Sequence, residues 1–255
     1  MLQMLCALLR AMGSGVVLLC LLLASAAEAE PRLFVVGVED QPYLPFFTVV
    51  DGEYRGYARE LLDAFAQTKG YQFQYKPLPV KRLRKQFDEG KLDFKFPDNP
   101  LWRDKNAVGP IIHYSIPLTA YTDGALVRPM WLGQGMQHIK VLGTQLGFTP
   151  VAYQADIDSG QIRLVQATRI ESLLKMAQIA RVDAIYMNPL VASHALRSAG
   201  MPEDTVVYDA TLPHVSSHYY LASLEHAQVL DELNRFMVDQ VALVRQLKEK
   251  YGIPE

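Results

Sequence analysis

Cysteine is almost absent from this sequence of 255 residues, and its two copies lie near the start. They are Cys6 and Cys20, both within the first 29 residues. We expect that segment to be removed, which leaves no disulfide, no thiolate nucleophile and no cysteine-ligated metal. The remaining chain of about 226 residues is long enough to be stabilised by its hydrophobic core alone.

An excess of charge of either sign is lacking as well. The chain carries 25 Lys and Arg against 27 Asp and Glu, a formal net charge of −2. This balance disfavours a nucleic-acid partner, because such binders neutralise phosphates with surplus basic residues. With 50% hydrophobic and 20% charged residues, the composition excludes a disordered or low-complexity chain.

No apolar run is long enough to span a membrane, since a span needs about 20 apolar residues. The longest run, residues 16–24, follows a single basic residue, Arg10, and precedes the small-x-small site Ala27-Glu28-Ala29. This order is typical of a secretory signal peptide rather than of an anchor. We therefore expect residues 1–29 to be a signal peptide cleaved after Ala29, with translation starting at Met1, Met4 or Met12, and the mature protein to lie in the periplasm.

The common motifs of catalytic and cofactor sites are missing. The sequence contains no Ser-His-Asp motif, no P-loop and no Gly-x-Gly-x-x-Gly fingerprint. His214 and His218 are spaced as on a helix, but Pro213 and the strand-like Tyr219-Tyr220 argue against one. No third ligand lies near them, and zinc needs at least three protein ligands. We expect neither a metal nor another cofactor.

Strand and helix patterns alternate from residue 30 onward. The continuous apolar run 33–38 is typical of a strand buried on both faces, and Leu61, Leu62 and Phe65 form a helical stripe that Gly70 ends. The expected strands are 33–38, 71–76, 92–96, 140–143, 162–166, 182–187 and 218–222. The expected helices are 57–69, 79–89, a short one from 149, 170–180, one from 189, and 230–251. This alternation predicts an α/β fold with mainly parallel sheets.

Two boundaries divide this pattern, near residues 120–129 and 212–217. They predict that the chain crosses twice between two lobes. Residues 30–122 and 214–255 form the first lobe in this interpretation, and residues 123–213 form the second. A cleft between two lobes is a common place for a small ligand.

Several stretches, in this order, resemble the family 3 periplasmic solute-binding proteins, the receptors of polar amino-acid ABC importers. The resemblance covers nearly the whole mature chain and marks a divergent member. It implies a periplasmic-binding-protein-like type II fold, two α/β lobes joined by two crossover strands that close on a ligand. The stretches are Val38-Glu39-Asp40-Gln41-Pro42-Tyr43-Leu44-Pro45-Phe46, Gly56-Tyr57-Ala58-Arg59-Glu60-Leu61-Leu62, Phe87-Asp88-Glu89-Gly90-Lys91-Leu92-Asp93, Ile179-Ala180-Arg181-Val182-Asp183-Ala184-Ile185 and Tyr219-Tyr220-Leu221-Ala222.

Two positions of the family's ligand site are identified by this resemblance. Arg103 best matches the arginine that binds the ligand's α-carboxylate, a role that suits a planar guanidinium. The alternative is a surface arginine paired with Asp104. Asn188 stands where the family has the aspartate that takes the α-ammonium, and an amide accepts a hydrogen bond without neutralising charge. We therefore expect an anionic group of the ligand to matter more than a cationic one.

Other candidate ligand contacts follow the strands that lead into the cleft. They are Asp40, Tyr43, Phe46, Arg82, Phe96, Asp98, Trp102, Thr144, Phe148 and Thr149. Alternatives stay open for several of them: Phe46 as lobe core, Arg82 as part of a solvated helix face, and Thr149 as a helix N-cap. A cationic ligand held by Asp40 and Asp98 among aromatic rings is the competing pocket.

Three functions fit these features. The first is a non-enzymatic, monomeric protein that captures a small polar solute for an ABC permease. The second uses the same clamp as a sensor that docks on a membrane signalling receptor. The third is an enzyme resembling cyclohexadienyl dehydratases, for which Asp98 and Glu39 are the available acid or base groups.

Overall fold

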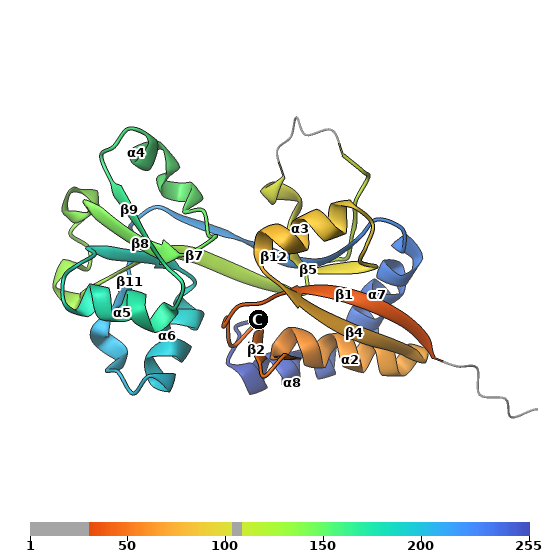
Figure 1. Cartoon of the computed structure of the whole chain (residues 1–255). Coiled ribbons are helices and arrows are strands. Elements are labelled where there is room, and N and C mark those ends of the chain that lie inside the picture. The colour runs from red at the N-terminus through yellow and green to blue at the C-terminus, as the bar shows by residue number, and fades with distance from the viewer. Residues whose placement is uncertain (1–30, 104–108) are drawn as a thin grey trace, which may run out of the picture. The chain divides into compact units, whose positions relative to one another are not determined.

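A computed structural model describes residues 31–103 and 109–255. The predicted signal peptide lies outside the described residues, and its cleavage stays a prediction. Residues Leu33–Glu255 fold as two α/β lobes joined by two crossover strands, so the predicted fold class is confirmed (Figure 1). In the described part of the chain, no helix is both long and apolar enough to cross a membrane.

The first lobe is built on a sheet with strand order β4-β1-β5-β12. Strands β1 and β5 run parallel, with Val36 opposite Phe94, and their apolar side chains are buried except for Leu33 and Val35 near the start of β1. The strands of this lobe are β1 (Arg32–Glu39), β4 (Tyr71–Leu78), β5 (Phe94–Asp98), the hairpin β2 (Thr48–Val50) and β3 (Glu53–Arg55), and β6 (His113–Tyr114). Charged residues at the ends of β1 and β5 thereby come close together.

Four helices cover this sheet: α2 (Tyr57–Lys69), α3 (Val80–Asp88), α7 (Ala227–Asp239) and α8 (Val241–Tyr251). Helix α2 follows Gly56, whose φ of 112° lies in the region that favours glycine. A Cβ at Gly56 would lie 2.8 Å from the Cα of Phe47, so a larger residue would displace the aromatic loop before β2. This contact fixes the loop that carries Tyr43.

The predicted helix over 230–251 is wrong in one respect, because two helices replace it. Gln240, with φ −108° and ψ 34°, separates α7 from α8. Helix α7 packs against β12 and β6, whereas α8 packs against α2, and one straight helix cannot reach both surfaces. Val241, the first residue of α8, is exposed.

The second lobe is built on the strand order β7-β10-β8-β9, with β11 also paired to β7. Strands β10, β8 and β9 run parallel, and the apolar face of α5 packs on them, whereas α6 packs against α5 and β7. The elements are β8 (Val141–Gln145), β9 (Arg163–Ala167), β10 (Ala184–Met187), β11 (Val207–Tyr208), α4 (Gln154–Asp158), α5 (Ile170–Gln178) and α6 (Pro189–Ser198). Short 3-10 turns connect them: η2 (Pro129–Trp131), η3 (Met136–His138), η4 (Val151–Tyr153) and η5 (Glu203–Thr205).

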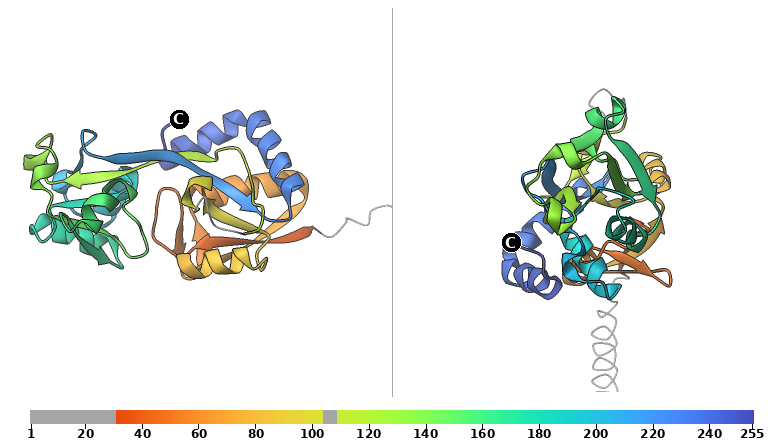
Figure 2. Two further views of the ribbon diagram at one scale, coloured as in Figure 1. Left: turned by 90° about the horizontal axis from the view of Figure 1, so that it is seen from above. Right: turned by 90° about the vertical axis from the view of Figure 1, so that its left-hand side faces the viewer.

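Strands β7 (Thr119–Val127) and β12 (His214–Ser223) run side by side from one lobe to the other (Figure 2). They pair antiparallel from Tyr219 opposite Thr119 to His214 opposite Gly124. Beyond this ladder β7 pairs with β10, and β12 pairs with β5. The residue numbers at which we divided the lobes stay a prediction.

Candidate functional site

A cavity of about 530 Å³ lies between the two lobes and against the crossover strand β7. The lining residues that carry charge or an aromatic ring come from both lobes: Glu39, Arg84, Lys95, Asp98, Trp102 and Arg103 from the first, Tyr121 and Asp123 from β7, and Phe148 and Tyr186 from the second. Its volume is that of an ordinary site for a small ligand. The polar groups in its wall fall into three clusters.

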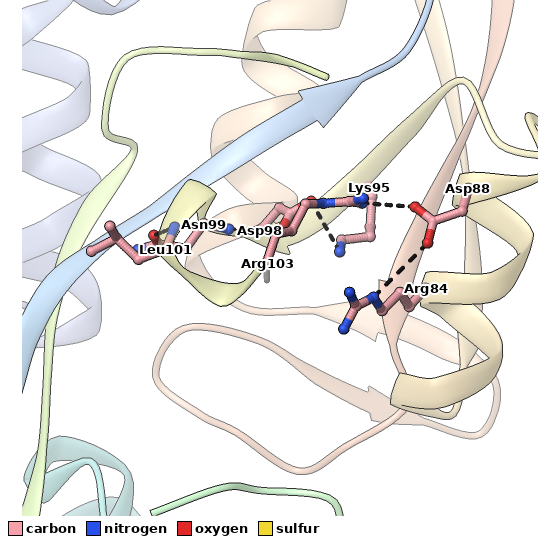
Figure 3. A network of polar contacts seen from close by, with 7 residues as sticks. All are labelled: Arg84, Asp88, Lys95, Asp98, Asn99, Leu101 and Arg103. Carbon is pink, nitrogen blue, oxygen red and sulfur yellow. Dashed lines mark hydrogen bonds and ion pairs between the residues drawn. The ribbon is translucent and has the colours of Figure 1, made fainter. Parts of the chain in front are cut away.

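The first cluster is basic and lies at the end of α3. Asp88 receives two guanidinium groups: Nη2 of Arg103 lies 2.7 Å from its Oδ1, and Nε of Arg84 lies 3.9 Å from its Oδ2 (Figure 3). Nε of Arg103 is buried and has no hydrogen-bond partner among the described residues. Among the described residues two cations share one carboxylate here, which leaves one positive charge of this cluster unbalanced.

The second cluster is an ion pair between neighbours on β5. Nζ of Lys95 lies 2.9 Å from Oδ2 of Asp98, and both side chains are buried (Figure 3). The backbone N–H of Asn99 donates to Asp98 Oδ1, and Asn99 Oδ1 accepts from the N–H of Leu101 at the start of the turn η1 (Pro100–Trp102). These bonds position Trp102, whose Nε1 donates to the Tyr121 hydroxyl at 3.1 Å.

The third cluster is acidic and contains Glu39 and Asp123. Glu39, at the end of β1, is only 7% exposed, and burial raises its pKa from 4.5 to about 7. Lys95 opposes this shift, and Asp98 and Asp123 add to it. Burial also raises the pKa of Asp123 from 3.8 to about 7, although the hydroxyl of Tyr43 donates to its Oδ1 at 3.3 Å.

Aromatic rings connect the lobes behind this cluster. Phe148 of the second lobe stacks on Tyr43 of the first, with ring centroids 5.6 Å apart. The stack continues through Phe47, Tyr54 and Tyr75. Phe148 therefore contacts both the cavity and the core of the opposite lobe.

Five of the twelve predicted site residues line this cavity: Asp98, Trp102, Arg103, Phe148 and Thr149. They come from both sides of the cleft, as the resemblance implied. The observed partner of Arg103 is Asp88. Asp104, its predicted alternative partner, lies outside the described residues.

The other seven predicted residues do not line the cavity. Phe46 and Phe96 are fully buried in the core, and Tyr43 is buried behind Asp123. Asp40 and Arg82 are exposed, and Arg84, one half-turn further along α3, lines the cavity instead of Arg82. Whether any of these contacts a ligand is untested.

Thr144 and Asn188, the last two of the seven, have structural partners. The hydroxyl of Thr144 donates to the carbonyl of Tyr186 at 3.0 Å. Asn188 is 1% exposed, and its Oδ1 accepts from the N–H of Leu190 at 2.8 Å. Asn188 is thus the N-cap of α6, a common role for asparagine.

Sequence reasoning missed most of the charged groups in the wall. Lys95 is a charged residue flanked by Phe94 and Phe96. Asp123 is a charged residue in the middle of the segment that forms β7. A charged residue inside an otherwise apolar strand was the signal that could have identified both, because burying such a group without a purpose is costly. In the described ranges no group of three His, Cys, Asp or Glu side chains could hold a metal ion.

No protein-family model matches the sequence, and no curated protein matches it. Solved structures do match. A histidine kinase sensor domain with similarity to periplasmic binding proteins is 18% identical, with a TM-score of 0.69 over 89% of this chain and 99% of that chain. An ancestral arginine-binding protein bound to arginine is 17% identical, with a TM-score of 0.66 over 88% and 99%.

An ABC uptake transporter substrate-binding protein from Streptococcus pneumoniae with bound histidine is 15% identical, with a TM-score of 0.66 over 86% of this chain and 92% of that chain. At these identities the likeness shows the fold alone. The fold is that of the periplasmic-binding-protein-like proteins, and the structural neighbours named here are binding proteins or a sensor domain.

Proposed function

We propose that the protein is a non-enzymatic, periplasmic solute-binding protein, a divergent relative of family 3, that delivers a small polar solute to an ABC importer. The observation that carries this proposal is the cavity between the lobes, whose wall combines aromatic rings with fixed charges of both signs. Such a wall suits an amino acid or a related compound, because each charged end of the solute meets an opposite charge.

The basic cluster is the proposed contact for an anionic group. Arg84 and Arg103 share Asp88, so a ligand carboxylate would balance the remaining positive charge and could accept a hydrogen bond from Nε of Arg103. Trp102 and Phe148 would pack on the apolar part of the solute, and Thr149 lies at the second-lobe side of the cavity. The competing pocket of Asp40 and Asp98 gains less support, because Asp40 is exposed and Asp98 is paired with Lys95.

The neighbouring structures agree with this class of ligand. One binds arginine and another binds histidine, both small polar amino acids. A sensory role is the second candidate, since a histidine kinase sensor domain matches with a TM-score of 0.69. Genes for a permease beside the gene for this protein would favour transport, and genes for a kinase or cyclase would favour sensing.

A thermal-shift screen tests the proposed binding. Purified protein is heated with amino acids, polyamines, organic acids and short peptides, each in excess. We expect at least one solute with a carboxylate to raise the melting temperature, because a ligand that binds only the folded state stabilises it. If no solute of the panel raised it at any pH from 5 to 8.5, the proposed function would be wrong.

Export is part of the same proposal. We expect the mature protein to begin near Glu30 and to be recovered from the periplasmic fraction. N-terminal sequencing of the protein from cell fractions checks this. Retention of Met1 in a membrane fraction would contradict it.

A further inference from the structure

Glu39 is a buried carboxyl to which the described part of the chain offers no direct partner. It is 93% removed from solvent, lines the cavity, and makes no hydrogen bond or ion pair with the described residues. An isolated buried carboxyl is costly to keep, and such groups are normally paired. Lys95, the nearest opposing charge, is already held by Asp98 at 2.9 Å. The side chain is therefore left for something that enters the cavity.

Asp123 lines the same cavity from a different element, the crossover strand β7. Its described hydrogen bond, from the Tyr43 hydroxyl, is long at 3.3 Å and involves one of its two oxygens. Asp123 adds to the raised pKa of Glu39, and both carboxyls add to the raised pKa of Tyr43, so all three groups lie in one region of the site. The ring of Tyr186 also lines the cavity, and aromatic faces favour a nearby cation.

We propose that Glu39 and Asp123 form one proton-linked subsite for a cationic group of the ligand. Near pH 7 the two carboxyls are partly protonated while the cavity is empty, and they release these protons to the solvent when a protonated amine or guanidinium enters. This inference deepens the proposed function, on which it rests. It assigns the cationic group to carboxyls at the end of β1 and on β7 rather than to Asn188, whose side-chain oxygen caps α6.

The surroundings of both carboxyls support this assignment. Burial raises the pKa of Glu39 and of Asp123 to about 7, so both are partly protonated near neutral pH. The titratable and charged groups that face them are Lys95 and Asp98 on β5, Tyr43 on the loop after β1, Tyr54 on β3, Tyr121 on β7, Tyr186 on β10 and Tyr219 on β12. Lys95 is the one cation of this set, and Asp98 neutralises it.

The sign of the pH dependence follows from these values. A cation stabilises the ionised carboxylates and lowers their pKa, so its binding releases protons. Below pH 7 the carboxyls are protonated in the empty protein, and affinity for a cationic ligand falls. Above pH 8 they are already ionised, and affinity becomes independent of pH.

Calorimetry with L-arginine as the probe tests the proposal on the unaltered protein. Titrations are run at pH 5.5, 7 and 8.5, and the titration at pH 7 is run in phosphate and again in imidazole, whose different ionisation enthalpies reveal proton release. We expect the Kd to rise at least tenfold from pH 8.5 to pH 5.5, as required when a group of pKa about 7 must ionise. Between about 0.5 and 1 proton should be released per L-arginine bound at pH 7.

Variants assign the effect to the two residues. The double variant Glu39→Gln, Asp123→Asn should bind L-arginine more weakly, with no proton release and no pH dependence. Asp51→Asn removes an exposed carboxyl of the same lobe that does not line the cavity, so it is the control and should behave as the unaltered protein. The measurement on the unaltered protein stands on its own if the double variant does not fold.

The outcomes separate this inference from the proposed function. L-arginine binding with the same Kd at pH 5.5 and 8.5 and without proton release would overturn the inference and leave the function standing. Binding of L-glutamate or L-glutamine in place of L-arginine, with the same Kd at pH 5.5 and 8.5 and without proton release, would do the same. Failure of every solute in the thermal-shift panel, L-arginine included, to bind at any of the three pH values would overturn both.

Discussion

At the scale of single residues, the buried carboxyl of Glu39 makes the free energy of unfolding depend on pH. Its pKa is about 7 in the folded protein and near 4.5 when unfolded, so the folded state holds the extra proton between these values. The free energy of unfolding therefore falls as pH rises through this window and levels off above pH 7. The loss in the free energy of unfolding that this pKa shift causes is at most about 3 kcal/mol.

We expect Glu39→Gln to remove this loss. At pH 4 the variant and the unaltered protein should have similar stability, because Glu39 is then protonated. At pH 8 the variant should be more stable by about 1–3 kcal/mol, since glutamine does not ionise. Urea denaturation at both pH values measures the difference, and equal stabilities at pH 8 would show that Glu39 ionises without strain.

Arg103 and Arg82 are two arginines of the first lobe that differ in their access to the cavity. Arg103 lines the cavity with an unpartnered buried Nε, whereas Arg82 lies on the exposed face of α3. Arg103→Ala should raise the Kd of a carboxylate ligand at least tenfold, about 1.4 kcal/mol, while Arg82→Ala should change it less than twofold. Calorimetry with the solute found in the screen measures both. A larger effect at Arg82 would move the anion contact to the other end of α3.

The predictable residues were those whose role depends on chain order. Trp102 and Arg103 follow the buried strand β5, and Phe148 and Thr149 follow β8, so the end of a strand located them. Glu39, Lys95 and Asp123 depend instead on which face of three strands, distant in sequence, turns toward one cavity. The register between β1 and β5 and the course of β7 set that face, and both result from tertiary packing.

At the scale of secondary-structure elements, Asn188 stabilises α6 as its N-cap. Asn188→Ala should lower the free energy of unfolding by about 1 kcal/mol, because the N–H of Leu190 loses its acceptor. Asn188→Asp should retain the cap, since aspartate is equally favoured there. Neither change should alter the affinity for α-amino acids, as measured by calorimetry. If Asn188→Asp raised that affinity, the ammonium contact inferred from the family resemblance would be correct.

Whole elements were easier to predict than the points where they break. The apolar stripe of Leu61, Leu62 and Phe65, ended by Gly70, gave α2 its observed bounds. The stripe over 230–251 was equally regular, yet Gln240 interrupts it without a proline or glycine. That break arises because α7 and α8 pack against different elements, which a local pattern does not encode.

In the whole molecule, the cavity between the lobes couples ligand binding to stability. At a ligand concentration 100-fold above Kd, the free energy of unfolding should rise by about 2.7 kcal/mol. For a protein of this size the melting temperature should then rise by roughly 5–10 °C. Calorimetric scans measure the rise, and X-ray scattering should show a smaller radius of gyration if the lobes close on the ligand. A stabilising ligand that leaves the radius unchanged would argue against closure.

The placement of the two tryptophans gives the protein a built-in optical reporter. Trp102 lines the cavity, is 41% exposed and is hydrogen-bonded to Tyr121. Trp131 lies in the second lobe, stacked on His138 with ring centroids 4.3 Å apart, and does not line the cavity. A solute that excludes water from Trp102 shifts its emission to shorter wavelength, whereas the emission of Trp131 stays constant. Fluorescence titration of the unlabelled protein thus follows occupancy of the cavity directly. In Trp102→Phe only the emission of Trp131 remains, and it serves as the reference.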